Sequence, residues 1–195
     1  QVQAYDAKGV ASERTLEIWQ KGTDKRLVRF TAPARLAGTA LLVPDGHTVY
    51  LYLPAYGRAR RVVGEAQGDA FLGTDFSLED LSRLKWADEY VPEAIGDHAL
   101  RLRPKEGVKT PSAWIDLTVR PEDHLPASVA HFRADGTMIR RITFSDVRDI
   151  QGRPLAHSLR VEDVASGRRT EATIQSAKLD SGLADDLFTL AQLQR

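Results

Sequence analysis

The second half of the chain alternates apolar and polar residues with a period of two. Residues 115–120 (Ile-Asp-Leu-Thr-Val-Arg) and 155–162 (Leu-Ala-His-Ser-Leu-Arg-Val-Glu) both follow this pattern, which is typical of strands in a sheet with one buried face. From Trp114 onward, turn signals recur about every 12–16 residues, a spacing that fits strands joined by hairpins. The pattern therefore predicts an antiparallel meander. A parallel α/β fold would need helices between these strands, and no helical period is present there.

Turn signals also divide the first half of the chain. Glycine supplies positive φ angles and aspartate hydrogen-bonds its own backbone, so both residues gather where strands reverse. The first four residues after Gln1, Val-Gln-Ala-Tyr, read as a further strand. The sequence therefore predicts a mainly β protein with a few helices. The turn signals are Gly22-Thr23-Asp24, Pro44-Asp45-Gly46, Arg120-Pro121-Glu122-Asp123, Ala134-Asp135-Gly136, Gln151-Gly152-Arg153-Pro154 and Ser166-Gly167.

The predicted strands differ in how many of their faces are apolar. Residues 48–53 are apolar or aromatic on both faces, whereas residues 140–144 mix charged and apolar side chains. Some strands must then be covered on both sides while others show one face to water. A strongly curved sheet that wraps around a helix would produce this mixture. A sandwich of two sheets is the alternative.

Two segments are predicted to be helical. In Ser77–Leu84, the side chains of Leu78, Leu81 and Leu84 share one face, and Ser77 with Asp80 forms a loose capping box. The second predicted helix is short and covers residues 181–188. The chain has no internal repeat and no linker, so its 195 residues are expected to form one domain, 1–195.

Composition excludes several classes of protein. Cysteine is absent, which excludes disulfides, cysteine-ligated metals and thiol catalysis. Lys+Arg and Asp+Glu both number 27, and this zero balance argues against a nucleic-acid-binding protein. No apolar stretch approaches the ~20 residues of a spanning helix. Because the chain begins at Gln1, we expect a processed protein whose signal peptide or lipid anchor lay upstream.

Groups suited to catalysis are sparse. The five histidines lie far apart and no pair has the H-x-x-x-H spacing, so no metal site is expected. There is neither a G-x-S-x-G motif nor a glycine-rich phosphate loop. Ser82 and Lys85 match S-x-x-K and are the basis of a hydrolase alternative, but the accompanying motifs of penicillin-recognising enzymes are missing. We therefore expect no enzyme and no cofactor.

The most informative region runs from Val49 to Phe76 and is rich in aromatic and aliphatic residues. One interpretation is ordinary core. The other is the wall of an apolar cavity for a lipid tail, which needs many apolar side chains and few polar groups. Within the region, the basic run Arg58-Ala59-Arg60-Arg61 is either a solvated loop or a contact for anionic headgroups or an acidic partner.

Several blocks between Arg14 and Leu81 form a recognisable set. The most specific is residues 71–81, an F-x-G-S/T-D-F run that leads into E-D-L. The others are Phe30-Thr31-Ala32-Pro33, Gly38-Thr39-Ala40-Leu41-Leu42, the D-G-x-T-x-Y-x-Y-x-P run of residues 45–54, the basic run of residues 58–61 and, near the end, Asp186-Leu187-Phe188-Thr189. Together they resemble the LolA-type outer membrane lipoprotein-sorting proteins of the LolA/LolB-like superfamily.

This resemblance implies a strongly curved antiparallel sheet, an unclosed half-barrel, with helices inside as a lid. It implies a periplasmic, non-enzymatic carrier that shelters the acyl chains of a lipid or lipoprotein on the way to the outer membrane. Some members are thought to work with RND- or MMPL-type inner-membrane exporters. LolA carriers also use an arginine near the cavity mouth, for which Arg26 and Arg35 are both candidates here.

We therefore predict an apolar lipid-binding cavity closed by the helix at Ser77–Leu84. Arg58, Arg60 and Arg61 are the candidate contacts for a headgroup or partner. The alternative function is a periplasmic docking or sensor module, associated with an RND/MMPL-type exporter, that uses the same basic run. The candidate cavity and lid residues are Val49, Leu51, Leu53, Phe71, Phe76, Leu78, Leu81, Leu84, Trp86, Ile115 and Leu117.

Overall fold

The computed structural model describes residues 1–63, 71–82 and 86–194. Its main element is one antiparallel sheet of thirteen strands, in the order β6-β5-β4-β3-β2-β1-β13-β12-β11-β10-β9-β8-β7. The strands are β1 (Val2–Tyr5), β2 (Ala11–Lys21), β3 (Lys25–Ala32), β4 (Ala40–Val43), β5 (Val49–Leu53), β6 (Arg58–Val62), β7 (Tyr90–Gly96), β8 (Ala99–Pro104), β9 (Trp114–Val119), β10 (Pro126–Phe132), β11 (Met138–Ile150), β12 (Arg153–Asp163) and β13 (Arg169–Thr173).

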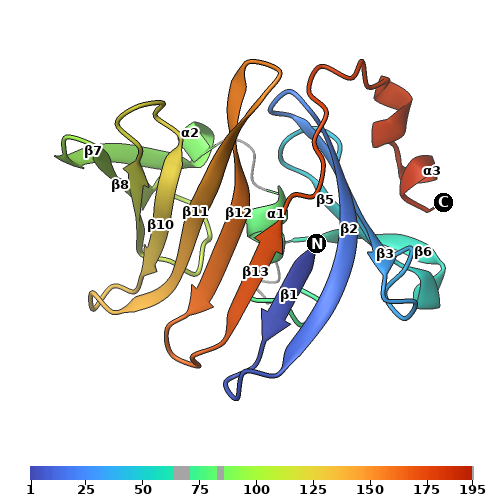
Figure 1. Cartoon of the computed structure of the whole chain (residues 1–195), viewed down its shortest axis with the longest axis horizontal. Coiled ribbons are helices and arrows are strands. Elements are labelled where there is room, and N and C mark those ends of the chain that lie inside the picture. Colours follow the sequence, from blue (N-terminus) through green and yellow to red (C-terminus); the bar gives the residue numbers. More distant parts are fainter. Residues whose placement is uncertain (64–70, 83–85, 195) are drawn as a thin grey trace.

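The sheet is curved and does not close, because β6 and β7 form its two free edges (Figure 1). The chain begins in the middle of the sheet, where β1 pairs with β13. It winds outward to β6, crosses to the opposite edge at β7 and returns strand by strand to β13. This arrangement confirms the predicted half-barrel and excludes the sandwich. The predicted meander after Trp114 is also confirmed, since β9 to β13 are consecutive neighbours.

All six predicted turns lie between consecutive strands. The turn between β4 and β5 shows why: one carboxylate oxygen of Asp45 accepts the backbone N–H groups of His47 and Thr48 at 3.0 and 2.7 Å. Gly46 in the same turn has a φ of 83°, which favours glycine. Local chemistry therefore fixes the strand ends.

The helices are short, and the first begins at the predicted capping box. The Asp80 backbone N–H donates to Ser77 Oγ at 3.1 Å, and the Ser77 N–H donates to Asp80 Oδ2 at 2.8 Å. Helix α1 covers Leu78–Ser82, and residues 83–85 lie outside the described part of the chain. The other helices are α2 (Trp86–Glu89), α3 (Leu190–Leu193) and two 3-10 turns, η1 (Pro54–Tyr56) and η3 (Asp185–Phe188).

The second predicted helix is only partly correct. Residues 185–188 form η3, but Ala184 is extended and residues 181–184 are not helical. The physical reason is Gly182, whose φ of 66° is incompatible with a right-handed helix. The sequence pattern also gave no indication of η1, α2 or α3.

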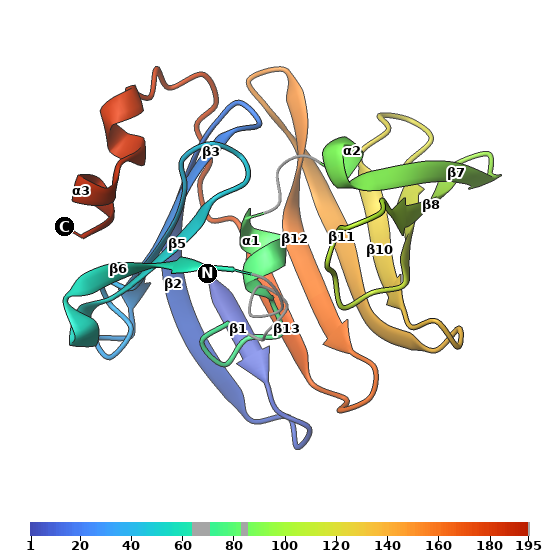
Figure 2. The ribbon, with the colours of Figure 1, turned by 180° about the vertical axis from the view of Figure 1, so that it is seen from behind.

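Apolar side chains cover both faces of the sheet around β3, β4 and β5. On the inner face, where α1 lies in Figure 2, the first inner cluster comprises Val28, Phe30, Leu41, Val43, Val49, Phe71 and Leu78. The second inner cluster, over β8 to β13, comprises Phe76, Tyr90, Leu102, Ile115, Val129, Ile142 and Val161. On the outer face, the C-terminal segment adds Phe188 and Leu193 to Leu27, Ala40 and Leu42, which form the outer cluster.

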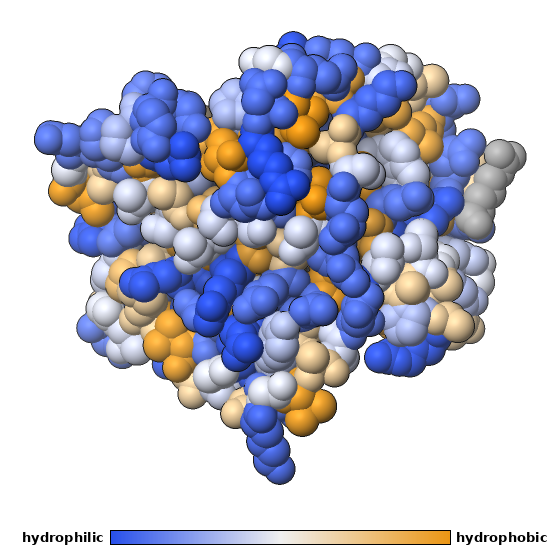
Figure 3. Space-filling model, viewed as in Figure 1, coloured by the Kyte–Doolittle hydropathy of each residue, from blue (hydrophilic) through white to orange (hydrophobic). Residues whose placement is uncertain are grey.

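These clusters explain why residues 48–53 are apolar on both faces. Val49 and Leu51 contribute to the first inner cluster, while Tyr50 and Tyr52 pack against the outer cluster. The outer face of β8 to β13 is instead polar, with ion pairs such as Arg101–Asp116 and Arg169–Glu171. Figure 3 shows this side of the molecule as mainly hydrophilic with scattered apolar spots. Among the described residues, no helix combines the length and apolar content needed to cross a bilayer.

Candidate functional site

The inner face of the sheet is crossed by a segment that connects its two edges. We call residues 71–82 the inner segment. Its apolar side chains divide between the two inner clusters, with Phe71 and Leu78 in the first and Phe76 in the second. All three side chains are buried. The inner segment is therefore packed against the part of the sheet where the sequence predicts a lipid cavity.

The structure brings most of the predicted cavity and lid residues to this inner face. Leu53, at the end of β5, is half-buried and belongs to neither inner cluster, and Leu84 lies outside the described residues. The use of these residues in lipid binding stays a prediction. The first inner cluster or its margin holds Val49, Leu51, Phe71, Leu78 and Leu81, and the second holds Phe76, Trp86, Ile115 and Leu117.

Buried charged groups of the sheet also hold the inner segment. Arg14 on β2 donates from Nε to the Leu72 carbonyl and from Nη2 to the Gly73 carbonyl, both at 3.1 Å. Burial, and secondarily the neighbouring charge of Arg35, lowers the pKa of Arg14. The guanidinium thus fixes the start of the inner segment through its backbone.

Replacing Gly73 with alanine should destabilise this contact. Gly73 has a φ of 71°, and an added Cβ would lie 3.0 Å from Arg14 Nη2. Gly57 is a matched control, because its φ is 62° and nothing lies within 4 Å of its Cβ position. We expect Gly57→Ala to cost about 1 kcal/mol from backbone strain alone, and Gly73→Ala about 2 kcal/mol in denaturant unfolding. Equal losses in the two variants would mean that the Arg14 contact contributes nothing.

Asp75 anchors the middle of the inner segment to β13. Its carboxylate accepts Thr170 Oγ1 at 2.8 Å and Arg168 Nε at 3.0 Å. The Asp75 N–H in turn donates to Thr170 Oγ1 at 2.8 Å. Because the Asp75 carboxylate is buried, its hydrogen bonds and its guanidinium partner are needed to offset the lost hydration.

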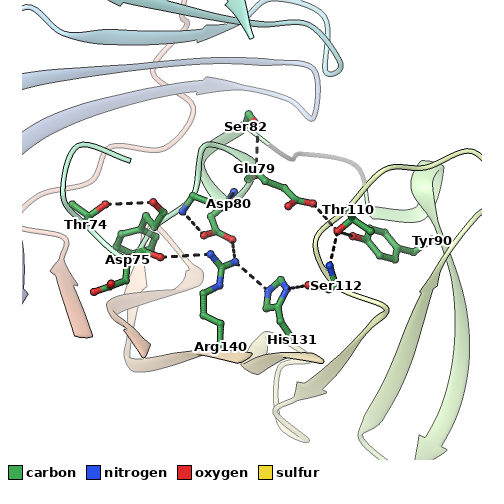
Figure 4. Close-up of polar contacts among 12 residues, drawn as sticks. Thr74, Asp75, Glu79, Asp80, Ser82, Tyr90, Thr110, Ser112, His131 and Arg140 are labelled. Carbon is green, nitrogen blue, oxygen red and sulfur yellow. Dashed lines mark hydrogen bonds and ion pairs between the residues drawn. The ribbon is translucent and has the colours of Figure 1, made fainter. Parts of the chain in front are cut away.

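Asp80 in α1 forms a buried ion pair with Arg140 on β11, 2.6 Å from Asp80 Oδ1 to Arg140 Nη2 (Figure 4). The same Nη2 lies 3.3 Å from His131 Nε2, and His131 Nδ1 lies 2.8 Å from Ser112 Oγ. A guanidinium can only donate, so His131 Nε2 accepts. In the neutral ring, Nδ1 then carries the proton and donates to Ser112.

This serine–histidine pair is therefore not arranged for nucleophilic catalysis. A serine nucleophile needs a histidine nitrogen that accepts its proton, whereas His131 Nδ1 donates toward Ser112. Ser82 of the hydrolase alternative donates instead to the Glu79 carbonyl at 3.5 Å, and Lys85 lies outside the described residues. Within the described ranges there is no group of three or more His, Asp or Glu side chains that could hold a metal.

Of the two arginines considered for the cavity mouth, Arg26 contacts the inner segment. Its Nη1 donates to the Leu81 carbonyl at 2.7 Å and its Nη2 to Gln20 Oε1 at 2.6 Å. Burial lowers the pKa of Arg26 to about 10, so the side chain stays charged at neutral pH. Arg35 is exposed.

The basic run forms the edge strand β6, so the interpretation as a loop is wrong. Arg58, Arg60 and Arg61 are all exposed. In the ladder with β5, Arg58 lies opposite Leu53, Arg60 opposite Leu51 and Arg61 opposite Tyr50. The sequence placed these arginines after an aromatic strand but could not show on which side of the sheet each one lies.

The comparisons with known proteins agree with this architecture. A family model with the description "Uncharacterized protein" matches residues 22–195. No curated protein matches the chain.

Three solved structures share the fold over nearly the whole chain. A domain from Vibrio parahaemolyticus named for outer membrane lipoprotein sorting is 22% identical with a TM-score of 0.85, covering 100% of this chain and 88% of that one. A DUF1329 family protein from Desulfovibrio piger is 25% identical with a TM-score of 0.85 (98% and 88% covered). A LolA superfamily protein from Nitrosomonas europaea is 20% identical with a TM-score of 0.78 (98% and 88% covered). The chain therefore belongs to the family that the matching model describes, and its fold is that of the LolA superfamily.

Proposed function

We propose that this protein is a non-enzymatic periplasmic carrier that shelters the acyl chains of a lipid or lipoprotein and moves them toward the outer membrane. The observation that supports the proposal best is the inner segment, which covers an apolar sheet face with its own apolar side chains. Two of the similar structures carry names from lipoprotein sorting or the LolA superfamily.

The proposed cargo site is the inner face itself. An acyl chain in water costs about 0.8 kcal/mol per exposed CH₂ group, so a carrier must offer an equivalent apolar surface. Phe71, Leu78 and Leu81 pack against the first inner cluster in the present structure. In the proposed cycle an acyl chain takes their place, and the inner segment serves as the lid.

The charged contacts of the inner segment make such a lid reversible. Arg14, Arg26 and Arg140 bind it mainly through carbonyl oxygens and one carboxylate, at its start, end and middle. These contacts are directional and can be exchanged with water when the segment moves away. The closed state is then stabilised without a fully apolar seal, and cargo can compete with it.

Introducing a charge at Leu81 should abolish cargo binding. Leu81→Arg places a guanidinium on the lid face that packs against the first inner cluster, where a charge without a partner cannot be buried beside an acyl chain. We expect the fluorescence of a bound fatty acid probe to be lost. Leu190→Arg is the matched control, because Leu190 is 42% exposed in the C-terminal segment. Unchanged binding by a folded Leu81→Arg protein would contradict the lid assignment.

The cargo class is best identified on protein purified without detergent. Native mass spectrometry followed by organic extraction should reveal a stoichiometric adduct that extracts as a lipid. A protein without adduct, and without uptake of fatty acid, phospholipid or acylated peptide, would contradict the carrier proposal. That outcome would favour a docking module that uses the same fold.

A further inference from the structure

The edge strand β6 presents two of its arginines on the inner face and one on the outer face. Residues directly opposite each other in an antiparallel pair point to the same side of the sheet. Leu51 packs against the first inner cluster, so Arg60, its partner, lies on the inner face. Tyr50 packs against the outer cluster, so Arg61 lies on the outer face.

Two further residues of β6 confirm this assignment. Val62 packs against the first inner cluster, and Ala59 packs against the outer cluster. Since side chains alternate along a strand, Arg58 and Arg60 share the inner face with Val62. Figure 2 shows β6 at the free edge of the sheet, on the side of the inner face where α1 lies.

The two inner-face arginines of β6 are not engaged with acidic groups. Both are exposed, and no ion pair within the described residues includes either of them. The contact that Arg60 makes is with an aromatic ring, its guanidinium carbon lying 4.9 Å from the centre of the Tyr56 ring. Arg14, Arg26 and Arg140 differ, because each already binds the inner segment.

We propose that Arg58 and Arg60 form a site for the anionic headgroup of an amphiphile whose acyl chain lies on the first inner cluster. The inference rests on the proposed function and narrows its cargo to lipids that carry a phosphate or carboxylate. An acyl chain beside Leu51 and Val49 would leave its polar end at this edge of the sheet. A guanidinium binds phosphate and carboxylate through paired hydrogen bonds, and the Tyr56 ring holds that of Arg60 in place.

Charged residues on an edge strand also prevent two sheets from joining edge to edge. Arg61 serves that purpose as well as its neighbours do, because the purpose requires only charge at the edge. The headgroup site requires charge on the inner face. The side of the sheet is therefore the property that separates the two explanations.

The test compares a pyrene-labelled phosphatidylglycerol with the matched pyrene-labelled diacylglycerol, on the full chain at 0.15 M salt. We expect the native protein to bind the anionic lipid about tenfold more tightly than the neutral one, as hydrogen bonds to charged groups predict. The double variant Arg58→Gln/Arg60→Gln should lose this preference and bind diacylglycerol as before. Arg61→Gln, on the same strand and equally exposed, should keep the preference.

Each other outcome has a distinct meaning. A preference that survives in the double variant would overturn the headgroup site and leave the carrier proposal standing. An equal loss per charge in Arg61→Gln and in the single variant Arg60→Gln would reveal general charge attraction and would also overturn the site. If neither lipid binds the native protein, the proposed function fails and the site with it.

Discussion

Replacing Arg140 with methionine should destabilise the closed protein and tighten its binding of lipid. The side chains of Arg140 and Asp80 are only 16% and 11% exposed. Removing one partner of such a pair leaves a buried charge without compensation, which costs about 3–5 kcal/mol. Methionine preserves most of the volume, so the loss in denaturant unfolding reports the charge rather than a void.

The same variant should release the inner segment from the sheet. If lipid binds only when the lid is open, the apparent dissociation constant equals the intrinsic one divided by the open fraction. A shift of about 1.4 kcal/mol toward the open state then tightens binding tenfold. We expect a fluorescent fatty acid to bind at least about tenfold more tightly, and hydrogen exchange in residues 71–82 to accelerate.

A control for this prediction is provided by the next residue of β11. Arg141 is exposed and points to the opposite face of the sheet, so Arg141→Met should change stability by no more than about 0.5 kcal/mol and leave binding unaltered. The double variant Asp80→Asn/Arg140→Met removes both charges and should recover part of the lost stability. If Arg140→Met lowers stability but changes neither exchange nor affinity, the inner segment is a permanent part of the core and not a lid.

The features that sequence predicted correctly depend on neighbours in the chain. The turn at Asp45 and Gly46 needs only the carboxylate and the two N–H groups that follow it. The capping box of Ser77 and Asp80 likewise spans three residues. Period-two alternation then gives strand faces, and the short connections give an antiparallel order. Half-barrel curvature came from the family resemblance and from the need to cover both faces of β5.

The contacts that hold the inner segment could not be predicted, because their partners lie far apart in the chain. Asp75 is separated from Thr170 by 95 residues, and Asp80 from Arg140 by 60. No local period links such pairs. One signal was nevertheless present: alternation places Arg140 on the same face as Ile142 and Phe144, and a charge on an apolar face needs a buried partner. That partner can be identified only when the path of residues 71–82 is known.

The two faces of β3 and β4 show the same limit. Sequence indicated that strands in this region are covered on both sides, yet it did not show which segment covers the outer side. The C-terminal segment does so, and its path depends on Gly182, whose positive φ prevents the longer helix that the pattern suggested. The inner side is left for the inner segment, which separates stability on one face from the proposed binding on the other.

This separation predicts that Phe188→Ala will be strongly destabilising without changing lipid affinity. The Phe188 side chain is 4% exposed and packs in the outer cluster with Leu27 and Leu42. Truncating a buried phenylalanine costs about 3–5 kcal/mol, and we expect a loss in this range in denaturant unfolding.

The affinity of the folded Phe188→Ala protein for a fluorescent fatty acid should stay within about twofold of the native value, since inner and outer clusters lie on opposite faces of the same strands. Leu190→Ala is the matched control in the same C-terminal segment, and because Leu190 is exposed its cost should not exceed about 0.5 kcal/mol. A fall in affinity at a temperature where Phe188→Ala is fully folded would contradict the independence of the two faces. It would mean that the C-terminal segment controls the inner face through β3 and β4, whose side chains contribute to both clusters.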